Sequence, residues 1–167
     1  MASLLMPPPV LANTILSLMP CKLEQAQVQS ILYGSEWVIR PVRTLTETVR
    51  SLARCHSPLV ICETRFPDGD WRDLLAHLSS LDNISNLVLV AEHDVALAAE
   101  LVNLGGYDVL EKPLDRSECL HVFASARRNW YARMHFNTYA ALQRVAGRAG
   151  VFGEIVWETG PCRAALS

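Results

Sequence analysis

The chain has 167 residues, 50% of them hydrophobic and 19% charged, and its net charge is −2. These values are typical of one globular domain with a continuous core, and a nearly neutral chain argues against a nucleic-acid partner. The N-terminal segment lacks a basic region and is interrupted by prolines, and no later segment has the apolar length that a bilayer requires. We therefore expect a flexible arm over residues 1–13, no membrane partner and a cytoplasmic location.

Cysteine and histidine patterns exclude the usual metal and disulfide frameworks. The cysteines are Cys21, Cys55, Cys62, Cys119 and Cys162. Their odd number and wide spacing argue against disulfides and zinc knuckles and favour a reducing compartment. The histidines also lack ligand spacing, and no glycine-rich nucleotide-binding motif is present. We expect no metal and no cofactor, and we expect Cys62 to pack in the core.

Short apolar runs alternate with longer amphipathic stretches along the chain. The predicted strands are Thr14–Met19, Glu36–Arg40, Pro58–Glu63, Asn86–Ala91 and Asp108–Glu111. The predicted helices are Lys22–Tyr33, Leu45–Arg54, Asp70–Leu81, Val95–Leu104 and Arg116–Trp130. This alternation predicts an α/β fold with a doubly wound, five-stranded parallel sheet covered by helices on both faces, over residues 14–130.

Helix boundaries have their own signals. Thr44, Asp94 and Asp115 stand where N-caps are expected, and Gly105 with Gly106 is expected to end the fourth helix.

A Pro-Asp-Gly sequence lies between the third strand and the third helix. Pro67, Asp68 and Gly69 predict a turn in which Asp68 bonds the nearby backbone and Gly69 takes a positive φ. Asp70 is expected to cap the helix that begins at Trp71. Turn chemistry therefore explains both aspartates without a metal.

Beyond Trp130 the pattern predicts a C-terminal extension over residues 131–167, part helical and part irregular. Six arginines stand against two glutamates from Arg127 to Ser167. This basic segment fits a solvated helix face, and the scattered arginines form only a weak nucleic-acid pattern. Its role as an output device or an oligomerisation helix stays open.

Three stretches follow one another at the ends of the last three predicted strands: "PLVICETRFPDGDWRDLL", "NLVLVAEHD" and "LGGYDVLEKPLD". In this order and spacing, the chain resembles the receiver domain of bacterial response regulators, from about Thr14 to Trp130. The resemblance implies a flavodoxin-like (βα)5 three-layer sandwich and a role in two-component, phosphorelay signal transduction.

The resemblance also implies a set of site residues. These are a phospho-accepting aspartate after the third strand, an acidic pair for magnesium after the first, a hydroxyl residue after the fourth, and an aromatic and a lysine at the fifth. Glu63 stands at the place of the phospho-acceptor, and Met19 and Pro20 stand at the places of the acidic pair. Ala91 stands at the place of the hydroxyl residue and Val109 at that of the aromatic residue. The lysine is retained as Lys112 and is followed by Pro113.

These replacements predict that the phosphorylation chemistry is lost. Met19 and Pro20 offer magnesium no carboxylate, and Ala91 offers a phosphoryl group no hydroxyl. Because a partly buried lysine needs a partner, we expect a contact between Glu63 and Lys112. That contact either mimics a modified aspartate or only balances two charges, and both interpretations stay open.

Three functions are compatible with the sequence. The first is a degenerate, non-catalytic receiver that contacts a sensor kinase, an output protein or a second copy. The resemblance places that contact on the fourth helix, the fifth strand and the fifth helix. The apolar candidate residues for it are Leu101, Leu104, Tyr107, Val122 and Trp130, and several of these are also expected in the core. The second is binding of a small anion against Lys112, and the third is a flavodoxin-like enzyme.

Overall fold

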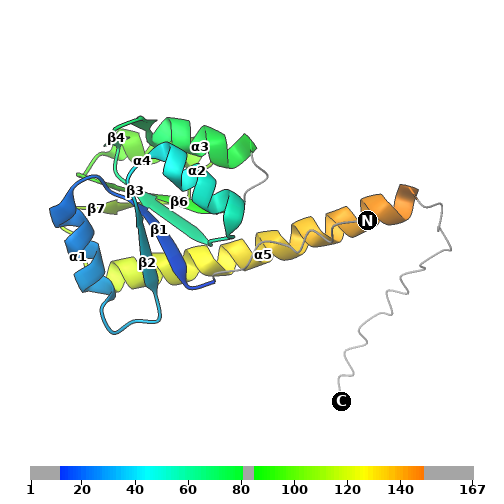
Figure 1. Ribbon diagram of the computed structural model, residues 1–167, viewed down its shortest axis with the longest axis horizontal. Coiled ribbons are helices and arrows are strands. Elements are labelled where there is room, and N and C mark those ends of the chain that lie inside the picture. Colours follow the sequence, from blue (N-terminus) through cyan, green and yellow to red (C-terminus); the bar gives the residue numbers. More distant parts are fainter. Residues whose placement is uncertain (1–11, 81–84, 149–167) are drawn as a thin grey trace, which may run out of the picture. The chain divides into compact units, whose positions relative to one another are not determined.

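The computed structural model describes residues 12–80 and 85–148. Most of the predicted N-terminal arm and the irregular part of the predicted extension lie outside these residues. Within them, a five-stranded sheet has the strand order β2-β1-β3-β6-β7, and every neighbouring pair is parallel. The predicted doubly wound fold is therefore confirmed (Figure 1).

The strands of the sheet follow the apolar runs closely. They are β1 (Thr14–Leu18), β2 (Val38–Val42), β3 (Leu59–Cys62), β6 (Asn86–Ala91) and β7 (Asp108–Glu111). The last two have the predicted bounds, whereas β2 begins at Val38 rather than Glu36. The central strands β3 and β6 are buried along their whole length, as expected for strands that helices cover on both sides.

Two layers of helices enclose the sheet. The helices are α1 (Lys22–Leu32), α2 (Leu45–Arg54), α3 (Trp71–Ser80), α4 (Val95–Asn103) and α5 (Arg116–Arg148). Because side chains alternate along a strand, Leu16 packs with the cluster that α2, α3 and α4 cover. Ile15 packs with the opposite cluster, which contains Val28 of α1 and Phe123 of α5.

Helix α5 is longer than the predicted Arg116–Trp130. The chain divides into two compact units, Met1–Met134 and His135–Ser167, and α5 belongs to both. The predicted boundary at Trp130 therefore lies within the first unit. No helix among the described residues is long and apolar enough to cross a membrane.

The predicted capping residues are confirmed. The side chains of Thr44, Asp94 and Asp115 each accept a hydrogen bond from the backbone N–H three residues later. At the end of α4, Gly105 has a φ of 97°, and the next amide donates to the carbonyl of Leu101 at 2.8 Å. The short polar and glycine signals thus fixed these boundaries.

A small hairpin, β4 (Arg65–Phe66) and β5 (Gly69–Asp70), was not predicted. The expectation of a positive φ at Gly69 is wrong, because among the described glycines only Gly34 and Gly105 have a positive φ. A Cβ atom at Gly69 would lie 2.8 Å from Oδ2 of Asp73. The glycine therefore permits the close approach of a carboxylate rather than an unusual backbone conformation.

Candidate functional site

A crevice of about 360 Å³ opens at the carboxyl ends of β3, β6 and β7. It brings together three of the predicted site residues, Glu63, Ala91 and Lys112. This is the edge of a parallel sheet at which ligands and chemistry usually gather. Val109 instead packs against the core on the side of α2, α3 and α4. The resemblance therefore selected a real crevice, although not every residue that it named lies there.

The ammonium group of Lys112 hydrogen-bonds the carboxylate of Glu24, in the first turn of α1. Both side chains are partly buried, with 26% and 24% of their surfaces exposed. Lys112 lies two residues after Leu110, which packs on the α1 side of the sheet, so strand alternation directs the lysine toward Glu24. The predicted contact between Glu63 and Lys112 is therefore wrong. The peptide bond between Lys112 and Pro113 is cis.

Glu63 enters the crevice without a partner for its inner oxygen. Its Oε1 atom is buried and has no hydrogen-bond partner among the described residues, while its backbone N–H donates to the carbonyl of Leu18 at 3.3 Å. A buried, unpaired acceptor costs about 1–3 kcal/mol relative to a paired one. Glu63 is therefore neither a helix cap nor a member of an ion pair, and packing gives no account of it.

The end of β1 does not supply a magnesium site. Met19 is buried in the core beside α1, and neither its thioether nor the ring of Pro20 carries the oxygen ligand that magnesium requires. The nearby acid, Glu24, is held by Lys112. Among the described residues, no three His, Cys, Asp or Glu side chains gather as metal ligands. The end of β1 therefore lacks the carboxylates that would hold the metal implied by the fold family.

The loop after β6 uses its polar groups locally. Nδ1 of His93 lies 2.6 Å from Oε1 of Glu111, and Asp94 caps α4. Ala91 is buried and offers only a methyl group at the mouth of the crevice. The hydroxyl residue that does line the crevice is Thr64, one position after Glu63, which the sequence did not single out.

The charge of the crevice disfavours an anionic ligand. Glu24 compensates Lys112, so the remaining carboxylates on the crevice wall are those of Glu63, Glu92 and Asp94. A small anion would meet these carboxylates, and no unpaired lysine or arginine among the described residues of the crevice wall would offset them. The anion-binding hypothesis therefore loses the residue on which it depended.

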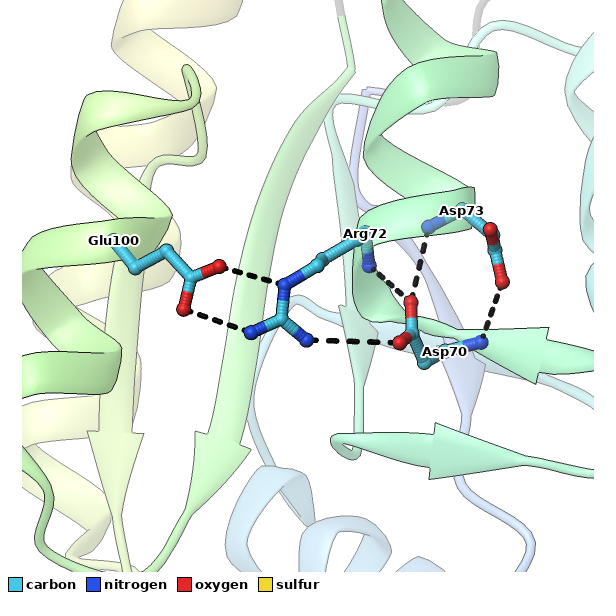
Figure 2. Close-up of polar contacts among 4 residues, drawn as sticks. All are labelled: Asp70, Arg72, Asp73 and Glu100. Atoms are coloured by element: carbon cyan, nitrogen blue, oxygen red, sulfur yellow. Dashed lines mark hydrogen bonds and ion pairs between the residues drawn. The ribbon is translucent and has the colours of Figure 1, made fainter.

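An ion pair joins α3 to α4 (Figure 2). Nε and Nη2 of Arg72 donate to the two carboxylate oxygens of Glu100 at 2.6 and 2.8 Å. The hydrogen bond from Arg72 holds the pKa of Glu100 below its ordinary value. The guanidinium also lies 4.6 Å from the ring centroid of Trp71, a cation–π contact. This planar, bidentate arrangement fixes the position of α4 against α3.

The start of α3 is capped as predicted. Asp70 accepts from the backbone N–H groups of Arg72 at 2.8 Å and Asp73 at 3.2 Å, and the Asp73 carboxylate accepts from the N–H of Asp70 in return (Figure 2). This reciprocal pair is a capping box.

Asp68 was expected to bond the backbone of its own turn, but its hydrogen-bond partners Leu45 and Thr46 lie in another strand–helix unit. Its carboxylate accepts from the N–H groups of Leu45 and Thr46 at 2.7 and 3.0 Å and so caps the start of α2. Desolvation raises the pKa of Asp68, but the hydrogen bonds from Thr46 and Leu45 together outweigh it and hold the pKa below its ordinary value. The loop that follows β3 is thereby tied to a helix that begins more than twenty residues earlier.

Cys62 packs in the core, as predicted. Its side chain is fully buried, and burial raises the pKa of the thiol far above its ordinary value. A thiol in this setting has almost no nucleophilic thiolate.

The predicted contact face requires a correction. Leu101, Val122 and Trp130 are buried in the core, so they cannot form a surface. Leu104 is exposed, and Tyr107 is half-buried and donates from its hydroxyl to the side chain of Ser125. The exposed apolar residues on and after α4 are Val95, Val102 and Leu104.

No family model and no curated protein matches the chain. Solved structures do. The signal receiver domain of a LuxO repressor protein from Vibrio parahaemolyticus is 19% identical with a TM-score of 0.67, over 78% of this chain and 98% of that one. The signal receiver domain of an HD domain-containing protein from Pseudomonas fluorescens is 24% identical with a TM-score of 0.67, over 74% and 92%.

A third match is the receiver domain of a sensor histidine kinase from Pseudomonas aeruginosa, in a structure with magnesium coordinated in its active-site cleft. It is 18% identical with a TM-score of 0.62, over 69% of this chain and 97% of that one. At these identities the likeness concerns the fold. This chain therefore has the receiver-domain fold, as its sequence predicts.

Proposed function

We propose that this chain is a receiver-like signalling module that is not phosphorylated and acts by contact with a partner protein. The observation that carries the proposal is the pairing of Lys112 with Glu24. In addition, Met19 and Pro20 stand at the end of β1, where the resemblance implies the acidic pair. A lysine that already has a carboxylate partner is not available to a phosphoryl oxygen. Without magnesium, the charge of a transferring phosphoryl group is also left unneutralised.

Glu63 fits this proposal as the residue at the acceptor position. A glutamate is one methylene longer than aspartate, and here its inner oxygen is buried and unpaired. The carboxylate is thus kept in the crevice without the ligands that would make it react. We propose that the module is a non-catalytic, degenerate receiver and that its output does not depend on a phosphodonor.

Magnesium binding tests the first half of the proposal. In isothermal titration calorimetry of the full chain, we expect no saturable heat at millimolar magnesium, because Met19 and Pro20 at the end of β1 offer the metal no carboxylate. A one-to-one binding isotherm that disappears in Glu63→Gln would show an intact metal site and would overturn the proposal.

The second half concerns the contact face, which we place on the outer side of α4. Val95 and Val102 are exposed on this helix, and Leu104 is exposed directly after it, while Glu100 on the same helix is paired with Arg72. An exposed apolar surface of this kind is typical of protein contacts. A sensor kinase, an output protein and a second copy are all candidate partners, and a second copy is the one that the purified chain can test.

Sedimentation equilibrium of the full chain provides that test. We expect reversible self-association that Val102→Asp weakens at least tenfold, because a charge would be desolvated in the contact. The matched control is Leu23→Asp, since Leu23 is an exposed apolar residue of α1, on the opposite face of the sheet. Equal weakening by the two variants would contradict a contact through α4.

A further inference from the structure

The C-terminal half of α5 presents a large exposed apolar surface. In the second unit, Phe136, Tyr139, Leu142 and Val145 have 73%, 52%, 63% and 67% of their surfaces exposed. The described part of this unit is one helix, which ends at Arg148. An isolated helix of this length is marginal in water, and a contiguous apolar patch of this kind marks an interaction site. We call these four residues the apolar face of α5.

The spacing of the apolar face determines its shape. Its members lie three residues apart, and each step falls about 60° short of a full turn of a helix with 3.6 residues per turn. The face therefore covers about half of the helix circumference. A two-stranded coiled coil needs a narrow seam that repeats every 3.5 residues. A second copy of this helix is thus a poor partner for the apolar face, whereas a broad face fits a flat apolar layer such as the acyl chains of a membrane.

The charge of the helix specifies the chemistry of that phase. No aspartate or glutamate occurs from Cys119 to Arg148, whereas five arginines do. One of them, Arg127, is paired with Glu36. On the half of the circumference away from the apolar face lie Asn137 and Arg144. An apolar face on one half of a helix, with an arginine on the other half and no acids nearby in the sequence, is complementary to an anionic surface.

We propose that the segment 135–148 of α5 lies in the interface of a membrane that contains anionic lipid. The apolar face is directed toward the acyl chains, and Arg144 reaches the headgroups. The sequence suggested no membrane partner because no segment has the length to span a bilayer, but a helix that lies in the plane of the interface needs no such length. This placement would bring the signalling domain to a membrane surface.

Vesicle flotation of the full chain tests the proposal. The probes are vesicles of phosphatidylcholine alone and of equal parts phosphatidylcholine and phosphatidylglycerol. We expect the wild type to float with the mixed vesicles and to remain at the bottom with phosphatidylcholine. Added salt should reduce the flotation, because part of the binding is electrostatic. Arg144→Gln should weaken the binding about fivefold, the equivalent of one surface charge.

Two variants with the same charge change separate apolar insertion from charge. Leu142→Glu places a carboxylate on the apolar face, and Asn137→Glu places one on the opposite half of the same helix. We expect Leu142→Glu to abolish flotation and Asn137→Glu to weaken it no more than about tenfold. Circular dichroism of both variants verifies that the fold is retained.

Three outcomes would overturn the proposal. The first is a wild type that does not float with the mixed vesicles. The second is equal flotation of the Leu142→Glu and Asn137→Glu variants. The third is a dimer in light scattering that Leu142→Glu alone dissociates while flotation is absent, since a second copy would then cover the apolar face.

Discussion

Lys112, at the end of β7, is bonded to Glu24 on α1, although Glu63 lines the same crevice as the lysine. The pair joins residues 88 positions apart in the sequence. It therefore ties the first helix to the last strand of the sheet. Among the described residues that line the crevice, Lys112 is the only lysine or arginine, so the pair also occupies the cation that a phosphoryl group or a small anion would require.

Double-mutant cycles in urea unfolding measure the coupling energy between Lys112 and each of the two acids, Glu24 and Glu63. We expect a coupling of about 1–3 kcal/mol between Glu24→Gln and Lys112→Met, because the pair is partly buried. The cycle of Glu63→Gln with Lys112→Met is the matched control and should give a coupling near zero. A larger coupling for Glu63 than for Glu24 would contradict the contact seen in the structure.

The cap that Asp68 provides for α2 should make stability depend on pH. The pKa of this carboxyl is lowered in the folded protein. The contribution of the ionised Asp68 to folding stability is therefore fully present above the unfolded-state pKa and is lost as pH falls through the folded-state pKa. Asp68→Ala should therefore lower the urea midpoint at neutral pH, and the difference from wild type should shrink below about pH 4. Asp108→Ala, which removes an exposed carboxylate bonded only to the adjacent N–H, should change the midpoint less.

The ion pair between Arg72 and Glu100 should restrain α4 more than it stabilises the whole domain, because both side chains are substantially exposed. We expect Glu100→Gln to increase amide hydrogen exchange in α4 while the melting temperature changes little. The swapped variant Arg72→Glu with Glu100→Arg should restore part of the protection. Unchanged exchange in Glu100→Gln would mean that packing of Leu101 alone holds the helix.

The thiols should differ sharply in reactivity. Cys62 is fully buried with a raised pKa, whereas Cys21 is exposed. Peptide-resolved mass spectrometry after brief iodoacetamide treatment should find Cys21 labelled and Cys62 unlabelled until urea is added. Rapid labelling of Cys62 in the native protein would reopen the case for a catalytic thiol at the end of β3.

The sequence predicted the parts of the fold that local signals determine. Asn86–Ala91 is a continuous apolar run, and Asp94 is a strong N-cap, so a strand and the helix after it could be assigned to within a residue. The hairpin of Arg65–Phe66 with Gly69–Asp70 was missed because strands of two residues show no periodicity. The sequence predicted a helix that ends at Trp130 and a part-helical extension after it. Because no glycine or proline stands near Trp130, α5 continues through that residue as one helix.

Contacts between distant elements were not predictable in the same way. Glu24 looked like an ordinary acid in the first turn of a helix, and only the crossing of α1 over the sheet brings it to Lys112. The alternation of side chains along β7 does predict the side of the sheet on which Lys112 lies, because Lys112 comes two residues after Leu110. Asp68 is a similar case, because its partners Leu45 and Thr46 belong to another strand–helix unit.

Intact-mass spectrometry of the full chain after incubation with acetyl phosphate and magnesium shows whether Glu63 can accept a phosphoryl group. We expect no added mass, because Met19 and Pro20 at the end of β1 offer magnesium no carboxylate and Lys112 is held by Glu24. A stoichiometric gain of one phosphoryl group, lost in Glu63→Gln, would show that the site is an active phospho-acceptor and would contradict the account.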